Sequence, residues 1–278
     1  MKLLSYIFAF CLFQSTYAQV YKTSEPLAHT YSIVARDSVT GNIGVAVQSH
    51  WFSVGSVVTY GKAGVGVVAT QSFVNPSYGP KGLALMEQGL SPQQALSALL
   101  ANDEGEMFRQ VAFLNTKGEV ATHTGSACID AAGHKQGKNF SVQANMMLNN
   151  TVWDAMATAF ETTTGDFGER IISALKAAQK EKGDIRGSQS AAILIVKGES
   201  TGNPWEDIVM DLRVEDHSNP VEELERLIKV HKAYDFMNKG DLAMEAGDTK
   251  LAESLYLSAQ KLFPDNLEMK YWYAINTK

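Results

Sequence analysis

The chain has 278 residues, of which 45% are hydrophobic and 19% charged, with 22 Gly and 7 Pro. This composition excludes collagen-like, low-complexity and intrinsically disordered chains. The length suits one large domain, or one medium domain with a small appendage, and either buries a substantial core. Lys and Arg number 24 against 30 Asp and Glu, a formal net charge of -6. Because the sequence also has no block of consecutive basic residues, we expect no nucleic-acid partner.

Residues 1–18 have the layout of a secretory signal peptide. Lys2 precedes an apolar run from Leu3 to Phe13, and a polar stretch then ends at Ala18. The apolar run is too short to span a membrane as a helix, so we expect cleavage after residue 18 and no stable membrane insertion afterwards. An uncleaved interfacial anchor is the alternative. The prediction is a periplasmic or secreted bacterial protein, with residues 19–29 as a leader or linker.

Cleavage at this point leaves Cys128 as the single cysteine, since Cys11 is removed. The mature chain then has no internal disulfide and depends on its hydrophobic core for stability.

Strand and helix patterns alternate in pairs from residue 30 onward. Strands are predicted at 30–36, 43–47, 56–60, 64–70, 111–115, 119–123, 190–196 and 208–214. Helices are predicted at 82–88, 91–101, 151–164 and 167–182. Paired strands followed by paired helices do not fit the regular alternation of a parallel sheet. We therefore predict an α+β fold over residues 30–218, a four-layer αββα sandwich of two antiparallel sheets.

Residues 219–278 are predicted to form a small all-α helical tail. Eight of its positions match the aromatic, small and helix-ending residues of one tetratricopeptide-like repeat: Phe236, Gly240, Ala243, Gly247, Ala252, Tyr256, Ala259 and Pro264. A single repeat does not bury its own apolar face, so it should dock on residues 221–230, on the main domain or on a protein partner. A helical hairpin with chance matches is the alternative.

No metal or cofactor motif is present. The six histidines include no HExxH pair, and one mature cysteine excludes CxxC. The glycines at 64–66 precede neither a helix nor a GK[ST] sequence, so strand packing explains them better than phosphate binding.

Three polar clusters could carry chemistry instead. In the loop from residue 70 to 82, the amides of Gln71 and Asn75 could donate to a substrate carbonyl or oxyanion, or the loop could consist only of turns. In the second cluster, Cys128 could be a nucleophile activated by nearby imidazoles, or simply a small buried side chain. The candidate binding residues of this second cluster are His123, Cys128, His134, Gln143 and Asn145. The third cluster could equally be an ion-pair network, and comprises Arg186, Gln189, Ser190, Asp211, Arg213, Asp216 and His217.

Thr30 offers a simpler chemistry, because it opens the first strand. If Thr30 became the chain's N-terminus, its hydroxyl could attack a carbonyl while its own α-amine, with a reference pKa of about 7.7–8.0, served as the base. Neither histidine nor metal would be needed. We expect such a residue at the mouth of the sandwich, outside the core, although it could also be only a β-branched strand opener.

Several separated motifs occur in a recognisable order. They include Tyr31-Ser-Ile-Val-Ala-Arg-Asp37, Gly44-Val-Ala-Val47, Ala69-Thr-Gln71, His123-Thr-Gly125, Gln143-Ala-Asn145-Met146, Gly187-Ser-Gln189 and Leu212-Arg213-Val214. Over roughly residues 30–227, the chain closely resembles the bacterial family called domain of unknown function 1028. The resemblance implies the fold of the N-terminal-nucleophile hydrolases, which cleave amide bonds after a cut exposes Thr, Ser or Cys. Only Thr30 matches the nucleophile's place.

Such a mechanism requires a second cut, between His29 and Thr30, by self-processing or by another protease. Lys62 lies 32 residues beyond Thr30, a spacing similar to that of the lysine that assists the nucleophile in proteasome-type sites; coincidence is the alternative.

Two functional hypotheses follow. The chain is either an exported amidohydrolase acting on a small-molecule or peptide amide, or a non-catalytic protein that binds a small ligand or cell-wall fragment while its tail docks a protein partner. A homo-oligomer is compatible with both.

Overall fold

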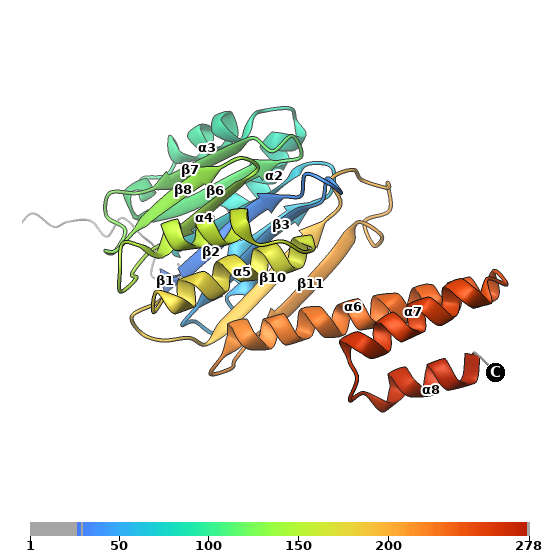
Figure 1. Cartoon of the computed structure of the whole chain (residues 1–278). Coiled ribbons are helices and arrows are strands. Elements are labelled where there is room, and N and C mark those ends of the chain that lie inside the picture. The colour runs from blue at the N-terminus through green and yellow to red at the C-terminus, as the bar shows by residue number, and fades with distance from the viewer. Residues whose placement is uncertain (1–26, 29, 277–278) are drawn as a thin grey trace, which may run out of the picture.

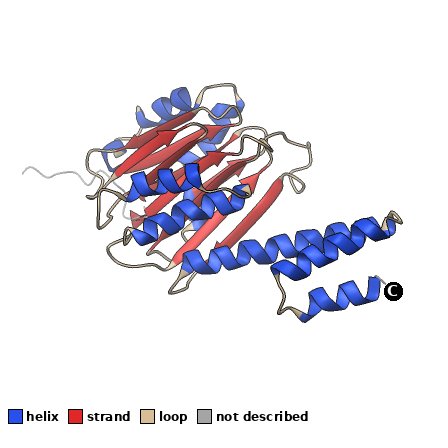
Figure 2. Ribbon diagram, in the orientation of Figure 1, coloured by secondary structure: helices blue, strands red, loops and turns tan. Residues whose placement is uncertain are grey.

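The computed structural model describes residues 27–28 and 30–276. Two antiparallel sheets form the centre, and helices lie against their outer faces (Figures 1 and 2). The predicted α+β class with two antiparallel sheets is therefore confirmed. The strands are β1 (Leu27–Ala28), β2 (Thr30–Arg36), β3 (Ile43–Ser49), β4 (Thr59–Lys62), β5 (Gly66–Phe73), β6 (Arg109–Asn115), β7 (Val120–Thr124), β8 (Gly133–Gly137), β9 (Phe140–Ala144), β10 (Ser190–Val196) and β11 (Ile208–Val214). The helices are α1 (Gly55–Val58), α2 (Tyr78–Glu87), α3 (Pro92–Leu100), α4 (Val152–Thr162), α5 (Phe167–Lys180), α6 (Pro220–Glu245), α7 (Thr249–Leu262) and α8 (Leu267–Asn276).

The two sheets differ in size and in connectivity. The five-stranded sheet has the order β1-β5-β6-β7, and β4 pairs with β5 beside β1. The six-stranded sheet has the order β11-β10-β3-β2-β9-β8. Strand β2 is therefore an inner strand of the larger sheet, with β3 on one side and β9 on the other.

Burial on both faces explains the apolar runs of the inner strands. One buried cluster fills the space between the sheets and contains Val34, Val45 and Val47 from the larger sheet with Val67 and Ala112 from the smaller. Alternate residues of β2 and β10, such as Ile33 and Ile193, point to the opposite face and pack under the helices. A strand covered on both faces is apolar at nearly every position.

Each outer face carries its own helices. Helices α4 and α5 cover the larger sheet, and α2 and α3 cover the smaller one. The predicted N-terminus of α3 is confirmed, because Ser91 and Gln94 form a capping box there. Asp166 and Glu169 form a second capping box at the start of α5.

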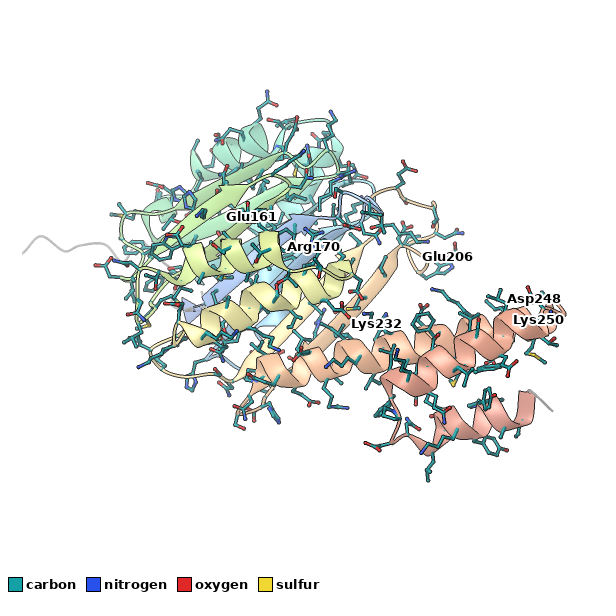
Figure 3. All side chains as sticks on the ribbon, in the orientation of Figure 1. Glu161, Arg170, Glu206, Lys232, Asp248 and Lys250 are labelled. Carbon is teal, nitrogen blue, oxygen red and sulfur yellow. The ribbon has the colours of Figure 1, made fainter. Side chains whose placement is uncertain are left out.

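Helix α6 links the sandwich to the C-terminal helices. Its first turns pack into the core beside α5 through Val221, Leu224 and Ile228. Lys232 then reaches Glu169 at 2.7 Å, where α6 passes the start of α5 (Figure 3). The remainder of α6 projects beyond the sheets and packs against α7 and α8 (Figure 1). Asp248 lies at the turn between α6 and α7, far from the sandwich (Figure 3).

A glycine permits the close approach of α6 and α7. A Cβ atom built on Gly240 would lie 2.6 Å from Cε1 of Tyr256, so only glycine fits beneath this ring. The hydroxyl of Tyr256 donates to Oδ1 of Asp241 at 2.5 Å. The small residues of the predicted helix pair thus lie at the helix–helix contact.

Two local predictions were wrong, and one hairpin was missed. Residues 56–60 form the short helix α1 and the start of β4 instead of one strand. Strand β5 continues to Phe73 and α2 begins at Tyr78, so the predicted loop is much shorter. The hairpin of β8 and β9 was missed, because β8 is polar and lies at the sheet edge, where no apolar alternation is required. The predicted signal peptide, and the leader apart from residues 27 and 28, lie outside the described residues.

Candidate functional site

Thr30 is the first residue of β2 and is completely buried, which corrects the expectation of an exposed position outside the core. Its carbonyl oxygen accepts hydrogen bonds from Nε2 of Gln71 at 3.1 Å and from the backbone nitrogen of Asn145 at 3.0 Å. The side-chain amide of Asn145 also reaches this oxygen at 3.4 Å. Two predicted binding residues therefore lie against the predicted nucleophile, one from each sheet.

Gln110, which the sequence analysis did not select, connects these amides. Its Oε1 accepts from Nε2 of Gln71 at 2.7 Å and from Nδ2 of Asn145 at 2.9 Å. Its Nε2 donates to the carbonyl of Ala144 at 2.9 Å and to the hydroxyl of Thr124 at 3.0 Å. A fully buried amide between two sheets is stable only when such partners exist. The network holds the Thr30 backbone in place.

Four buried oxygens at this end of the inter-sheet space have no hydrogen-bond partner within the described part of the chain. They are Oγ1 of Thr30, Oε1 of Gln71, Oε1 of Gln143 and Oδ1 of Asn145. Folded proteins leave few buried polar atoms unpaired, so a concentration of them requires a reason. These oxygens can accept hydrogen bonds from the N–H or O–H groups of a ligand, or from the amino group of a free chain N-terminus.

Strand β1 lies directly before Thr30 and covers the neighbouring edge of the smaller sheet. Leu27 pairs with Phe73, and Ala28 pairs with Ser72. The chain therefore passes from the smaller sheet into the larger one between residues 28 and 30. Ser72 has φ of 73°, a left-handed conformation that is unusual for serine within a strand and is often found at functional sites.

Gln143 lies further along β9 from the Thr30 carbonyl. Its Nε2 donates to the hydroxyl of Ser32 at 3.2 Å and to the carbonyl of Ala69 at 3.4 Å. It bridges the two sheets two residues along β2 from Thr30, and so supports the same polar layer.

The cysteine–histidine cluster does not have the geometry of an activated thiol. Burial raises the pKa of Cys128, and its Sγ donates to the carbonyl of Arg109 at 3.3 Å. Nε2 of His123 lies 3.1 Å from a carboxylate oxygen of Glu106. Neither His123 nor His134 hydrogen-bonds the thiol in the described structure. A protonated, enclosed thiol is a weak nucleophile.

His134 instead joins the outer part of the amide network. Its Nδ1 lies 2.8 Å from the hydroxyl of Thr124, which also accepts from Gln110. Local desolvation lowers the pKa of His134, and nearby His123 lowers it further. A neutral imidazole is therefore favoured beside the network.

Lys62 and Asn75 do not lie at the Thr30 site. Lys62 pairs with Gly66, five residues along β5 from Gln71, which corresponds to about 17 Å. Its ammonium group forms an exposed ion pair with Glu87 at 2.6 Å. The expectation that Lys62 assists Thr30 is therefore wrong in this structure. Oδ1 of Asn75 accepts from the backbone nitrogen of Ser77 before α2, which is a turn role.

A buried ion pair supports the end of β5. Arg109 is 2% exposed, donates to Oδ2 of Asp103 at 2.8 Å and donates to the carbonyl of Phe73 at 2.8 Å. Burial opposes ionisation of Asp103, but hydrogen bonds from Arg109 and the backbone of Gly105 outweigh it and lower the pKa of the carboxyl. The polar pair Arg109-Gln110 at the start of an apolar strand was the sequence signal for this part of the site.

The third polar cluster contains local ion pairs. Arg213 contacts Asp211 at 3.2 Å, and Gln189 donates to Asp216 at 3.2 Å. Arg186 pairs with the buried carboxylate of Asp184 at 2.5 Å. Ser190 of this cluster and Thr30 both pair with Ser49, so the cluster borders the Thr30 site at the same end of the larger sheet.

Across residues 27–28 and 30–276, no three His, Cys, Asp or Glu side chains gather as a metal site. Over the same residues, no helix combines the length and apolar character needed to cross a bilayer.

These motifs and this fold are shared with other proteins. The chain belongs to DUF1028, a family of unknown function, which matches residues 30–224. It is also similar to the crystal structure of protein SPO2555 from Silicibacter pomeroyi, which is assigned to the same family. The two are 31% identical with a TM-score of 0.65, over 72% of this chain and 88% of that one. No curated protein matches the chain.

Proposed function

We propose that this protein is an exported amidohydrolase of the N-terminal-nucleophile type, in which Thr30 becomes the nucleophile after residues 1–29 are removed. The observation that supports the proposal is the placement of Thr30. Thr30 is the first residue of an inner strand of the larger sheet. Its buried hydroxyl lies at the same end of the inter-sheet space as oxygens of Gln71, Gln143 and Asn145 that lack partners among the described residues. The αββα layering and the short covering strand β1 agree with such an enzyme before its maturation.

The reaction uses one residue for two roles. The free α-amine of Thr30 accepts the hydroxyl proton as Oγ1 attacks the amide carbonyl carbon. The tetrahedral intermediate collapses by breaking the C–N bond, and the proton passes to the departing amine. Water then attacks the resulting ester carbonyl, the acid product leaves, and the Thr30 hydroxyl regains its proton. No metal, redox partner or second substrate other than water is needed.

The surrounding amides have distinct roles in this proposal. Gln71 and the backbone of Asn145 fix the Thr30 carbonyl, and this fixes the direction of both its amine and its hydroxyl. The free amide oxygens can accept hydrogen bonds from the new amino group and so hold its lone pair toward Oγ1. Nδ2 of Asn145 is held by Gln110 at 2.9 Å and lies 3.4 Å from the Thr30 carbonyl, so its second N–H can turn toward a substrate oxygen while the first keeps it in the network.

The first experiment compares two chains that differ by one residue. A factor Xa recognition sequence placed immediately before Thr30 allows the folded precursor to be cut so that Thr30 becomes the N-terminus; the matched control retains one extra alanine before it. Both are tested against a panel of chromogenic acyl and peptide amides. The proposal predicts turnover only for the chain that begins at Thr30, because the extra residue converts the amine into an amide without basicity. Equal activity of both chains would exclude the N-terminal amine as the base.

We further propose that the tail contains one tetratricopeptide-like repeat that docks a protein partner. The packing of Gly240 against Tyr256 supports the repeat, since small residues at a helix pair's contact are typical of it. The tail also leaves apolar side chains exposed, including Leu242 at 64% and Leu267 at 78%. Most of the tail lies outside residues 30–224, which the family matches, so the tail's role can differ from that of the sandwich.

A non-catalytic binding protein is the second candidate. It is favoured by the complete burial of the Thr30 hydroxyl while β1 is in place. If the leader is permanent, the sandwich has no nucleophile with a free amine, and binding through its surface or tail becomes the main activity. Protein recovered from its native compartment with residues 19–29 still attached would favour this candidate.

A further inference from the structure

The edge of β5 nearest Thr30 is covered by β1. Strand β4 pairs with this edge only at residues 66–69, and β1 pairs with Ser72 and Phe73 further along. The opposite edge of β5 is paired with β6 from residue 66 to residue 72. Within the described structure, two leader residues therefore provide the only strand pairing at this part of the edge.

Removal of the leader uncovers a ready-made strand edge. The backbone groups of Ser72, which is paired with Ala28, lose that pairing, and exposed backbone groups at a sheet edge readily accept another extended chain. A peptide that adds to such an edge is held by main-chain hydrogen bonds, while its alternate side chains select for sequence. The vacated position adjoins the Thr30 hydroxyl, because β1 ends two residues before it.

From this geometry we infer that the substrate is an extended peptide whose acyl side replaces β1 on the edge of β5. The inference rests on the proposed function for the identity of the attacking group, and it specifies the substrate class. In the uncut chain, Leu27 and Ala28 occupy the third and second positions before the bond that must be cut, and they pair with Phe73 and Ser72. The corresponding residues of a substrate take the same places, so its scissile carbonyl is delivered to Thr30.

The receiving edge is held rigidly. Arg109, itself buried against Asp103, donates to the Phe73 carbonyl at 2.8 Å and fixes the end of β5. The turn that follows β5 is held as well, because the hydroxyl of Thr70 donates to the carbonyl of Asn75 at 3.3 Å. A strand edge that is already ordered loses little conformational entropy when a peptide binds.

An aromatic pair beside the edge indicates a preference for apolar side chains. The rings of Phe73 and Phe108 meet edge to face, with centroids 5.4 Å apart and an interplanar angle of 64°. The leader places Leu27 opposite Phe73 in the strand register. We therefore expect an apolar residue at the third position before the scissile bond.

The experiment uses the leader itself as the probe. The precursor carrying Thr30→Ala is folded, cut with factor Xa immediately before residue 30 and separated from its leader, and a synthetic peptide of residues 22–29 is then added. Binding is measured by fluorescence anisotropy for the unmodified peptide and for two versions N-methylated at the amide of Leu27 or of Ala28. In an antiparallel pair only alternate residues direct their N–H toward the neighbouring strand. One N-methyl group should weaken binding at least tenfold, and the other should change it less than twofold.

The outcomes separate the two proposals, because Thr30→Ala removes any turnover but not the edge. Equal affinity of all three peptides, or no binding of the unmodified peptide by a chain whose circular dichroism remains that of the folded precursor, would overturn the edge assignment. If the cut chain loses its fold, hydrogen exchange at the amide of Ser72 in the uncut precursor replaces the binding assay. If changing leader residue Ala28 to Pro removes the protection of this amide from exchange, the pairing of β1 with β5 is supported. Unchanged protection refutes it.

Discussion

Replacing Gln110 with methionine tests whether the buried amide network holds the site together. The side chains are similar in length, but methionine can neither accept from Gln71 and Asn145 nor donate to the carbonyls of Ala144 and Gly133. Gln71 and Asn145 each keep the Thr30 carbonyl as an acceptor for one N–H, but their other N–H loses the Gln110 oxygen, so the main loss is at these two buried donors.

The expected magnitude follows from these unpaired groups. A buried polar group left without its partner costs about 1–3 kcal/mol, so Gln110→Met should lower the free energy of unfolding by about 2–4 kcal/mol. For a chain of this size each kcal/mol corresponds to a fall of about 2–4 °C in melting temperature. Thermal unfolding followed by circular dichroism should therefore show a decrease of about 5–15 °C.

The matched control is Gln93→Met on the exposed face of α3, where the amide donates to the hydroxyl of Ser97 at 3.1 Å. This exposed substitution should change the free energy of unfolding by no more than about 0.5 kcal/mol. If Gln110→Met and Gln93→Met melt within 2 °C of each other, the network does not stabilise the site and its role in positioning Thr30 is refuted.

Four further predictions concern other parts of the molecule. Gly240→Ala should destabilise the tail by about 1–3 kcal/mol, because the new methyl group meets the ring of Tyr256; limited proteolysis should then cleave the tail faster, and unchanged cleavage would contradict the packing. Cys128→Ala should retain activity of the cut enzyme, and the native thiol should react slowly with Ellman's reagent, since burial keeps it protonated; loss of turnover would restore the thiol as a candidate nucleophile. Lys62→Met should leave turnover within twofold of the parent enzyme, whereas a larger loss would bring this lysine back into the mechanism. Asp103→Asn should make the free energy of unfolding fall less steeply as pH decreases. The folded-state pKa of Asp103 lies below its usual value of 3.8, so the unfolded chain binds the proton more readily. The parent protein therefore loses stability as pH falls through that range.

The apolar patterns of the sequence predicted the α+β class and most strands of the two antiparallel sheets. Strands such as β2 and β10 are apolar along their whole length because both faces are covered, and that pattern is visible without a structure. The hairpin of β8 and β9 was missed for the opposite reason. Residues His134, Lys135 and Gln136 lie on an exposed edge strand, where backbone pairing with β9 rather than side-chain burial determines the conformation.

The sequence predicted only those site residues whose side-chain chemistry by itself indicates a role. Thr30, Gln71 and Asn145 were selected for their chemistry, and the structure brings them together. Lys62 was selected from its spacing to Thr30, but distance along the chain does not determine distance across a sheet. Gln110 was missed because its importance depends on pairing between strands that lie far apart in the sequence.

The central claim concerns the residue at which the mature chain begins. Intact-mass measurement and N-terminal sequencing of protein recovered from its native compartment test this directly, without knowledge of the substrate. The account predicts a chain that begins at Thr30, with its α-amine free beside its hydroxyl. Mature protein that consistently begins at Gln19, or at any other residue before Thr30, would contradict it.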